Sequence, residues 1–380
     1  MLRWTTVIRE DSIRLMNKSS FGTHFTVTTW GESHGKALGA VVDGCPAGLS
    51  LCEKDIQKFL NRRKPGQSKF TTPRKEDDTV EILSGVFEGK TTGTPISLVV
   101  YNKNQQSKDY SEIASYYRPG HADYTFDMKY GFRDYRGGGR SSGRETIGRV
   151  AAGAIASKIL KSLNISIMTY SKSIGNVSIN YNNFNKDEIQ KNPMYMPDSN
   201  AAKLAGDMLK EKMAEMDSVG GIIECVVVGM PTGVGEPVFD KLDANLAKAI
   251  MSIGAVKGIE IGDGFAVATS TGSKDNDGFK VENGHISKTS NHAGGVLGGI
   301  SDGSPIVLRA AIKPTPSIAM TQQTVNKSME NIDINIKGRH DPIIVPRAVV
   351  VVESMVAITI VDLLFQSMTS RMDNIIKFFK

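Results

Sequence analysis

The sequence predicts a protein of mixed helices and short strands, either an α+β fold with mainly antiparallel strands or a parallel arrangement. Two observations lead to this prediction. Helical and strand-like segments alternate along the 380 residues, and several of the short strands alternate apolar and polar residues. Alternation within a strand is typical of an antiparallel sheet with one solvated face, whereas alternation of helices with strands also occurs in parallel sheets. Periodicity alone leaves both topologies open.

The first half of the chain contains three well-marked elements. Residues 25–30 have the pattern of a β-strand, and residues 53–63 that of an amphipathic helix with a basic end. Ser142 and Glu145 have the spacing of a capping box, so we expect a helix from about residue 143. Residues 173–200 are polar and are expected to form a surface excursion between the two halves.

The second half of the chain again alternates helices with strands, but no sequence repeat of the first half can be aligned. Its predicted elements are a helix at 201–216, a strand at 221–228, a helix at 242–253, a further strand, a polar loop at 271–292 and a glycine run at 294–299. Residues 348–365 are apolar but include Glu353 and Asp362. A buried core helix is therefore expected there in preference to a membrane span.

Composition and charge narrow the class of protein. The chain is 40% hydrophobic and 23% charged, as in soluble globular proteins, and its net charge of +6 suits a nucleic acid or a polyanionic small molecule. The three cysteines form no C-x-x-C pair, so neither a disulfide framework nor a zinc site is indicated. A reducing cytoplasm is the expected location, and the N-terminal residues lack the apolar core of a secretory signal.

A glycine-rich segment at 136–146 is the clearest local signal. Arg136-Gly-Gly-Gly-Arg-Ser-Ser-Gly-Arg-Glu-Thr leads into a predicted helix, whose N–H groups and positive dipole end favour an anion. The segment is no Rossmann fingerprint, because an arginine and two serines replace its third glycine. Nearby basic residues form either a solvated face or a site for carboxylates and phosphates. They are Arg118, Arg133, Arg136, Arg140, Arg144 and Arg149, with a second cluster of Arg62, Arg63, Lys64, Lys69, Arg74 and Lys75.

Three of the six histidines lie in turns beside a carboxylate. His34 occurs in Gly-Glu-Ser-His-Gly, His121 in Arg-Pro-Gly-His-Ala-Asp and His340 in Gly-Arg-His-Asp-Pro. Because histidine changes charge near neutral pH, these contexts favour acid–base roles. None has the H-x-x-x-H or H-E-x-x-H spacing of a metal site, so no metal is expected. The remaining histidines, His24, His285 and His292, are interpreted as structural or exposed.

Taken together, these segments resemble the chorismate synthase family. The matching strings are Thr-Thr-Trp-Gly-Glu-Ser-His-Gly at 28–35, Tyr-Arg-Pro-Gly-His-Ala-Asp-Tyr-Thr at 117–125, Tyr-Arg-Gly-Gly-Gly-Arg-Ser-Ser at 135–142, Asp-Ser-Val-Gly-Gly at 217–221, Ala-Val-Lys-Gly-Ile-Glu-Ile-Gly at 255–262, Asn-His-Ala-Gly-Gly at 291–295, Lys-Pro-Thr-Pro-Ser at 313–317 and Gly-Arg-His-Asp-Pro at 338–342. They follow the family order across about residues 21–365. Each string alone is weak, but this many in order is specific.

The resemblance implies one large α+β domain, with helices sandwiched between two mainly antiparallel β-sheets, assembled as a homotetramer. It implies a lyase that converts 5-enolpyruvylshikimate 3-phosphate to chorismate by 1,4-anti elimination of phosphate, the last step of the shikimate pathway. Reduced FMN is required although no net redox change occurs. The domain is expected at residues 21–370, with an N-terminal extension at 1–20 and a C-terminal tail at 371–380. Residues 1–15 precede the usual family start near Met16, so we interpret them as a vector-derived or misassigned extension.

The resemblance also assigns roles to individual residues. His34 corresponds to the acid that protonates departing phosphate, with Ser33 in its relay, and His121 to the histidine on the N1 side of the flavin. Asp341 corresponds to the carboxylate that helps flavin N5 accept the ring proton, with Ser142 as a hydrogen-bonding partner. The expected FMN contacts are Arg140, Ser141, Ser142, Gly254, Ala255, Gly298, Lys313, Pro314, Thr315, Pro316, Ser317 and Arg339. Arg63 and Lys69 match positions for dinucleotide or substrate phosphates, and Arg118 and Arg144 are candidates for the substrate carboxylates.

Two of these positions depart from the family pattern. Lys69 replaces the usual arginine and loses its bidentate fork, and Gly254 stands where asparagine is frequent, so any flavin contact there must come from the backbone. Two other functions remain open. A nucleic-acid-binding protein is motivated by the basic pI but lacks a recognised motif. An NADPH-dependent flavin oxidoreductase is compatible with the resemblance, since some chorismate synthases reduce their own flavin with NADPH.

Overall fold

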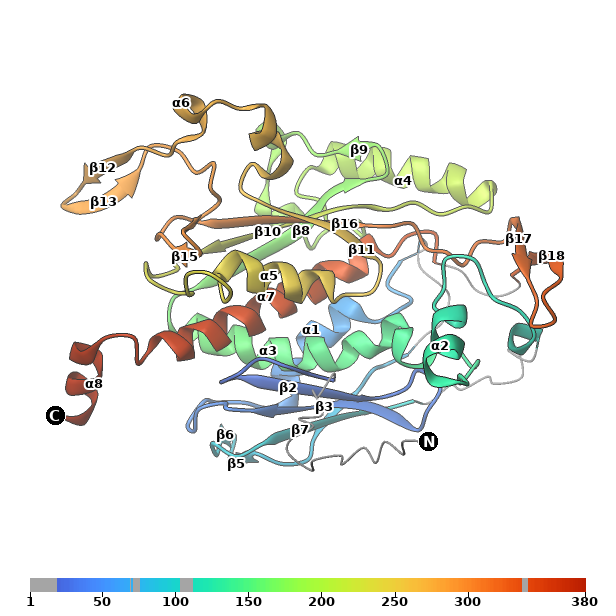
Figure 1. The fold of residues 1–380 in the computed structure, drawn as a ribbon, viewed down its shortest axis with the longest axis horizontal. Coiled ribbons are helices and arrows are strands. Elements are labelled where there is room, and N and C mark those ends of the chain that lie inside the picture. Colours follow the sequence, from blue (N-terminus) through green and yellow to red (C-terminus); the bar gives the residue numbers. More distant parts are fainter. Residues whose placement is uncertain (1–18, 69, 71–75, 103–111, 337–340) are drawn as a thin grey trace, which may run out of the picture.

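The computed structural model describes residues 19–68, 70, 76–102, 112–336 and 341–380. Within these residues, a layer of helices lies between two five-stranded sheets (Figure 1). The proposed extension at residues 1–15, together with Lys69, Arg339 and His340, lies outside the described residues.

Both large sheets are antiparallel throughout. The first has the order β1-β2-β3-β7-β4, with β1 at Ser20–Phe21, β2 at Thr26–Gly31, β3 at Ala37–Asp43, β7 at Ile96–Tyr101 and β4 at Val80–Ile82. The second has the order β11-β16-β10-β8-β9, with β11 at Val256–Ile261, β16 at Ile306–Ile312, β10 at Gly221–Val228, β8 at Ser166–Ile174 and β9 at Val177–Ser178. This pairing confirms the predicted α+β arrangement and excludes the parallel one.

Four helices form the central layer: α1 at Glu53–Arg63, α3 at Thr146–Ser162, α5 at Leu242–Met251 and α7 at Val345–Ser367. The others are α2 at Asp123–Tyr130, α4 at Ser199–Ala214, α6 at Gly272–Asp275 and α8 at Met372–Phe379. Small two-stranded ribbons complete the fold: β5 at Val86–Phe87 with β6 at Lys90–Thr91, β12 at Phe279–Glu282 with β13 at His285–Lys288, β14 at Val296–Leu297 with β15 at Ile300–Ser301, and β17 at Thr321–Val325 with β18 at Asn331–Asn335.

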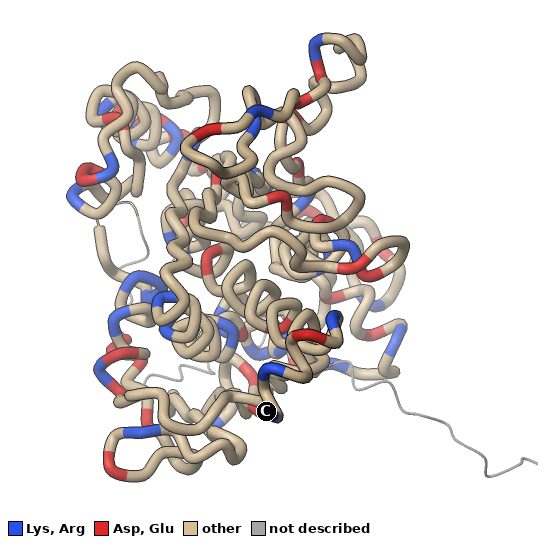
Figure 2. Tube along the Cα trace, turned by 90° about the vertical axis from the view of Figure 1, so that its left-hand side faces the viewer, with Lys and Arg blue, Asp and Glu red and all other residues tan. Residues whose placement is uncertain are grey.

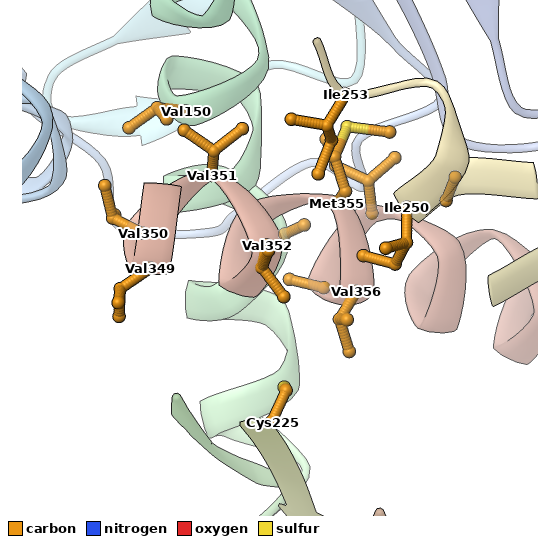
Figure 3. Close-up of a cluster of buried hydrophobic side chains, with 14 of the residues drawn as sticks. Val150, Cys225, Ile250, Ile253, Val349, Val350, Val351, Val352, Met355 and Val356 are labelled. Carbon is orange, nitrogen blue, oxygen red and sulfur yellow. The ribbon is translucent and has the colours of Figure 1, made fainter. Parts of the chain in front are cut away.

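The centre of the core is α7. Its valines, with Met355, face Val150 of α3, Ile250 and Ile253 of the α5 region, and Cys225 of β10 (Figure 3). By length and composition α7 could cross a membrane, but 83% of its most apolar window is buried inside the protein. It is therefore the core helix that the sequence predicts.

The contact between α3 and α7 is unusually close. A Cβ added at Gly153 would lie 2.2 Å from the Cβ of Ser354, so only glycine fits there. The small residues of α3 thus allow the two helix backbones to approach each other.

Several local predictions are confirmed. The helix at 53–63 and the strand at 221–228 have the predicted bounds, while the strand predicted at 25–30 is shifted by one residue and the helices predicted at 201–216 and 242–253 each differ by two residues.

Three local predictions are wrong in detail. The Ser142–Glu145 capping box does not form: Ser142 caps a short 3-10 turn at Gly143–Glu145, and the Glu145 carboxylate instead binds Arg149 of the next turn. The predicted loop at 271–292 contains α6 and the β12–β13 ribbon. The predicted surface excursion at 173–200 buries Ile179, Ile189, Met194 and Met196, because it folds over the outer face of the second sheet near β8 and β9.

Candidate active site

Most of the predicted site residues lie at one end of the helix layer, around the start of α3. They form three groups: a glycine-loop group next to His34, a strand-end group next to His121, and an ion-pair group next to Arg63. Arg149 of α3 links the helix that follows the glycine loop to the segment that contains Gly254 and Ala255. Its Nη1 donates to Ser252 Oγ at 2.6 Å.

The glycine loop is shaped around the His34 ring. Gly137, Gly138 and Gly139 have φ of +69°, +84° and +52°, which side-chain-bearing residues rarely adopt. A Cβ at Gly137 would lie only 1.9 Å from His34 Cε1. The run of glycines is therefore required by both the backbone conformation and the close approach of the imidazole.

Ser33 fixes the tautomer of His34. The Ser33 hydroxyl donates to the Gly137 carbonyl at 3.0 Å, and its oxygen lies 3.1 Å from His34 Nδ1. A hydroxyl has a single proton, so Nδ1–H must donate to Ser33. A neutral His34 then carries its only proton on Nδ1, and His34 can donate a proton from Nε2 only as an imidazolium. Both side chains are buried, with residue exposures of 1% for Ser33 and 7% for His34.

The polar residues after the glycines are held by local contacts. Arg140 donates to Thr29 Oγ1 at 2.6 Å and to the Gly31 carbonyl at 3.2 Å, which fastens the loop to β2. Ser141 Oγ donates to the Gly138 carbonyl at 2.7 Å, and Ser142 Oγ accepts from the Arg144 backbone N–H at 3.3 Å.

His121 lies between a carbonyl and a hydroxyl. Its Nδ1 is 2.9 Å from the Pro119 carbonyl and its Nε2 is 3.1 Å from Ser317 Oγ. Since a carbonyl only accepts, Nδ1 is the protonated nitrogen and Nε2 accepts from Ser317. Burial, reinforced by the Arg118 charge, lowers the pKa of His121 to about 4. The imidazole is therefore neutral at pH 7 in the ligand-free protein.

The segment Lys313–Ser317 continues from β16 and borders His121. Lys313 N donates to the Ala255 carbonyl at 2.9 Å, and its Nζ donates to the Gly120 carbonyl at 2.9 Å. Burial lowers the pKa of Lys313. Thr315 Oγ1 is buried without a hydrogen-bond partner among the described residues. The segment thus combines an amine and a buried hydroxyl available to a ligand.

Three of the predicted arginines, Arg63, Arg118 and Arg144, already have carboxylate partners. Arg118 makes two 2.8 Å hydrogen bonds to Asp123, and both side chains are buried. Asp78 accepts from Arg63 at 2.6 Å and from Arg144 at 3.1 Å. In the same group, Arg347 donates to Asp341 at 2.6 Å and to the Arg63 carbonyl at 3.1 Å.

Gly298 lies apart from these groups. It is in the β14–β15 turn, next to Gly299, whose carbonyl accepts from Leu242 at the start of α5. Gly254 and Ala255 follow the other end of α5, which is about 15 Å long at 1.5 Å per residue. Within the described part of one chain, Gly298 therefore does not join the other predicted FMN contacts.

The structure adds residues that the sequence did not single out. Asp78, Asn102 and Arg347 hold the ion-pair group together, and Thr29 anchors Arg140. No motif marks them, since their importance depends on contacts between distant parts of the chain. The described residues contain no group of three or more potential metal-binding side chains.

A cavity of about 550 Å³ lies beside the ion-pair group. Arg62, Tyr195 and Arg347 are among its lining residues. Its cations are already paired, Arg62 with Glu353, Arg347 with Asp341 and Lys191 with Glu188. Among the described lining residues, the cavity therefore offers no uncompensated charge for an anion.

Comparison with known proteins gives a consistent result. A family model described as chorismate synthase matches residues 25–365. A chorismate synthase from Agathobacter rectalis is 71% identical over 365 residues, which cover 96% of this chain and 100% of that protein, and one from Lachnospira eligens is 67% identical with the same coverage. One from Methanococcus vannielii is 53% identical, covering 92% of this chain and 97% of its own. A solved structure titled "Crystal Structure of Chorismate Synthase" aligns with a TM-score of 0.75 and 31% identity over 94% of this chain and 97% of that one.

Proposed function

The chain belongs to the chorismate synthase family of carbon–oxygen lyases, and from this premise we propose that it uses reduced FMN and the residues around His34 and His121 for a 1,4-anti elimination. Family membership supports the conversion of 5-enolpyruvylshikimate 3-phosphate to chorismate in aromatic biosynthesis. The elimination releases phosphate and a ring proton, so the substrate undergoes no net redox change. The observation that carries the proposal is that both histidines are held in defined tautomers, His34 beside the glycine loop and His121 beside Ser317.

The residues present fit a flavin mononucleotide. Three consecutive glycines with positive φ give the ligand close access to the backbone, and Thr315 has a buried hydroxyl with no described partner. Lys313 supplies positive charge beside His121, and a Cβ at Gly254 would meet open space. We assign FMN binding to Arg140, Ser141, Ser142, Gly254, Ala255, Lys313, Pro314, Thr315, Pro316 and Ser317, with Arg339. Gly298 would contribute only from another copy of the chain.

The two histidines act differently in this proposal. When bound, reduced FMN would supply electron density to the substrate as its C–O bond to phosphate breaks, and would offer N5 as the base for the ring proton. His34 donates a proton to the phosphate from Nε2, which requires its imidazolium form because Ser33 occupies Nδ1. His121 stabilises negative charge at the flavin N1 side, and an anion there would raise its pKa from the low ligand-free value. Asp341, with Ser142, assists removal of the ring proton.

Arginines and a lysine bind the anionic groups of the ligands. Arg118 and Arg144 are assigned to the substrate carboxylates, and Arg63 and Lys69 to phosphates of substrate or of NADPH. Basic and acidic residues alternate over much of the trace, and several basic segments lie together at the left of the view (Figure 2). Arg63, Arg118 and Arg144 are largely buried, which suits a small polyanion better than a nucleic acid.

We assign the protein to the cytoplasm as a homotetramer. Two projecting elements carry exposed apolar side chains that a second copy would cover. They are Phe279, Val281 and Ile286 on the β12–β13 ribbon, and Phe378 and Phe379 on α8. An isolated two-stranded ribbon is only marginally stable in water, so contact with another subunit would stabilise it.

An anaerobic assay tests the proposed function. The purified protein is mixed with 5-enolpyruvylshikimate 3-phosphate and chemically reduced FMN, and chorismate is followed by its absorbance. We expect turnover with reduced FMN and none without flavin, so turnover in the absence of any flavin would refute the cofactor assignment. A parallel reaction with oxidised FMN and NADPH tests whether this chain reduces its own flavin.

A further inference from the structure

Asp78 is a fully buried carboxylate that no motif identifies. Its side chain has 0% exposure, and its backbone has a φ of +46°, which is uncommon for a residue with a side chain. Gln57 of α1 holds this segment from both sides: its Nε2 donates to the Asp78 carbonyl at 3.3 Å and its Oε1 accepts from Val80 N at 3.1 Å. The surrounding contacts therefore maintain a strained backbone at this position.

The Asp78 carboxylate bridges two arginines from different elements. Oδ2 accepts from Arg63 Nη2 at 2.6 Å, at the end of α1, and Oδ1 accepts from Arg144 Nη1 at 3.1 Å, just before α3. Both guanidinium groups are buried, with side-chain exposures of 2% and 9%. Two buried cations repel each other unless a carboxylate lies between them. Glu76 also pairs with Arg144, but Asp78 is the carboxylate that both arginines share, and it allows them to occupy neighbouring positions.

The same network reaches the glycine loop and Asp341. Arg63 Nη1 donates to the Gly143 carbonyl at 3.3 Å, and the Arg63 carbonyl accepts from Arg347 Nε at 3.1 Å. Arg347 in turn donates to Asp341 at 2.6 Å. The side chain of Arg63 therefore contacts the segment before α3, while its backbone carbonyl contacts the partner of Asp341.

We propose that Asp78 is a positioning residue for the polyanion site, acting through Arg63 and Arg144 without touching a ligand. The inference rests on the proposed function, which assigns these arginines to the anionic groups of substrate and cofactor. Because the Asp78 carboxylate has no exposed surface, its contribution is geometric: it sets the spacing and orientation of the two guanidinium groups. Small displacements of such groups strongly reduce ligand affinity.

The substitution Asp78→Asn tests this role with little change in volume. Glu76 still pairs with Arg144, whereas Arg63 loses its only carboxylate partner among the described residues. We expect the dissociation constant for 5-enolpyruvylshikimate 3-phosphate, measured by calorimetry, to rise about 10- to 100-fold. KM should rise in parallel, while kcat at saturating substrate should fall less than about threefold.

Glu353→Gln is the matched control. Glu353 binds Arg62, the neighbour of Arg63 on α1, through hydrogen bonds of 2.9 and 2.6 Å. Within the described residues this pair does not contact the glycine loop or Asp341, so its loss should lower the melting temperature and leave substrate affinity unchanged. Equal weakening of substrate binding by both substitutions would show a merely structural effect and overturn the proposal, as would wild-type affinity in Asp78→Asn.

Gln57→Ala provides a second test if Asp78→Asn does not fold. It removes the side chain that holds the Asp78 backbone but leaves no buried charge without a partner. We expect a three- to tenfold rise in the same dissociation constant, about 0.7 to 1.4 kcal/mol, and an unchanged constant would contradict the proposal. A wild-type protein that binds no 5-enolpyruvylshikimate 3-phosphate would instead refute the proposed function itself.

Discussion

The low pKa of His121 predicts a loss of stability in acid. A histidine with a pKa of about 4 in the folded protein and about 6.5 in the unfolded chain binds more protons when unfolded at any pH between those values. Stability therefore rises with pH through this window and is lost as pH falls from 6.5 toward 4. Integration gives a loss of at most about 2 kcal/mol between pH 7 and pH 5, with a ceiling of about 3 kcal/mol below pH 4.

Urea unfolding of the wild type and of His121→Asn, at pH 7 and pH 5 and at one protein concentration, measures this contribution. Asparagine does not titrate and retains a donor for the Pro119 carbonyl. On acidification from pH 7 to pH 5, the free energy of unfolding should therefore fall by about 2 kcal/mol less in the variant than in the wild type. His292→Asn is the control of opposite sign, because Asp263 raises the pKa of His292 and its stabilisation is present at low pH and lost as pH rises. Equal acid sensitivity of wild type and His121→Asn would refute the assigned protonation state.

Three further substitutions test the site and the core. His34→Ala should lower kcat about 10²- to 10⁴-fold and leave substrate and flavin affinity nearly unchanged, because proton donation matters only as the C–O bond breaks. Steady-state kinetics and titration measure these effects, and an altered flavin spectrum in this variant would mean that the roles of His34 and His121 must be exchanged. Gly137→Ala should reduce turnover at least about 10²-fold, since its Cβ would lie 1.9 Å from His34 Cε1, whereas Gly272→Ala, which meets open space, should match the wild type in the same assay. Gly153→Ala should lower the unfolding free energy by about 1–3 kcal/mol in urea, because its Cβ would lie 2.2 Å from that of Ser354; wild-type stability would contradict the close approach of α3 and α7.

Local signals in the sequence predicted elements better than they predicted contacts. The helix Glu53–Arg63 was recognisable because its acidic start, basic end and apolar face all depend on neighbouring residues. The topology was not, since pairing β3 with β7 joins segments far apart in the chain, and the two-sheet arrangement came from the family resemblance. The glycine loop was identified from its residues, but its shape depends on His34 at a separation of about a hundred residues. Likewise, the bridge from Asp78 to Arg144 spans 66 residues and has no local pattern.

The position of α7 in the chain has a consequence for folding during synthesis. Residues 345–367 fill the space between the sheets, and Asp362 accepts backbone hydrogen bonds from Thr23, His24 and Phe25, which lie 337 to 339 residues earlier in the chain. Until α7 has emerged from the ribosome, the inner face of the second sheet has no helix α7 to cover it. Contacts between segments so far apart in the chain slow folding, and the apolar face of the sheet stays exposed until α7 has been synthesised. We therefore expect the nascent chain to expose apolar segments of the kind that chaperones bind, and truncation before α7 should yield aggregates in place of two separately folded sheets.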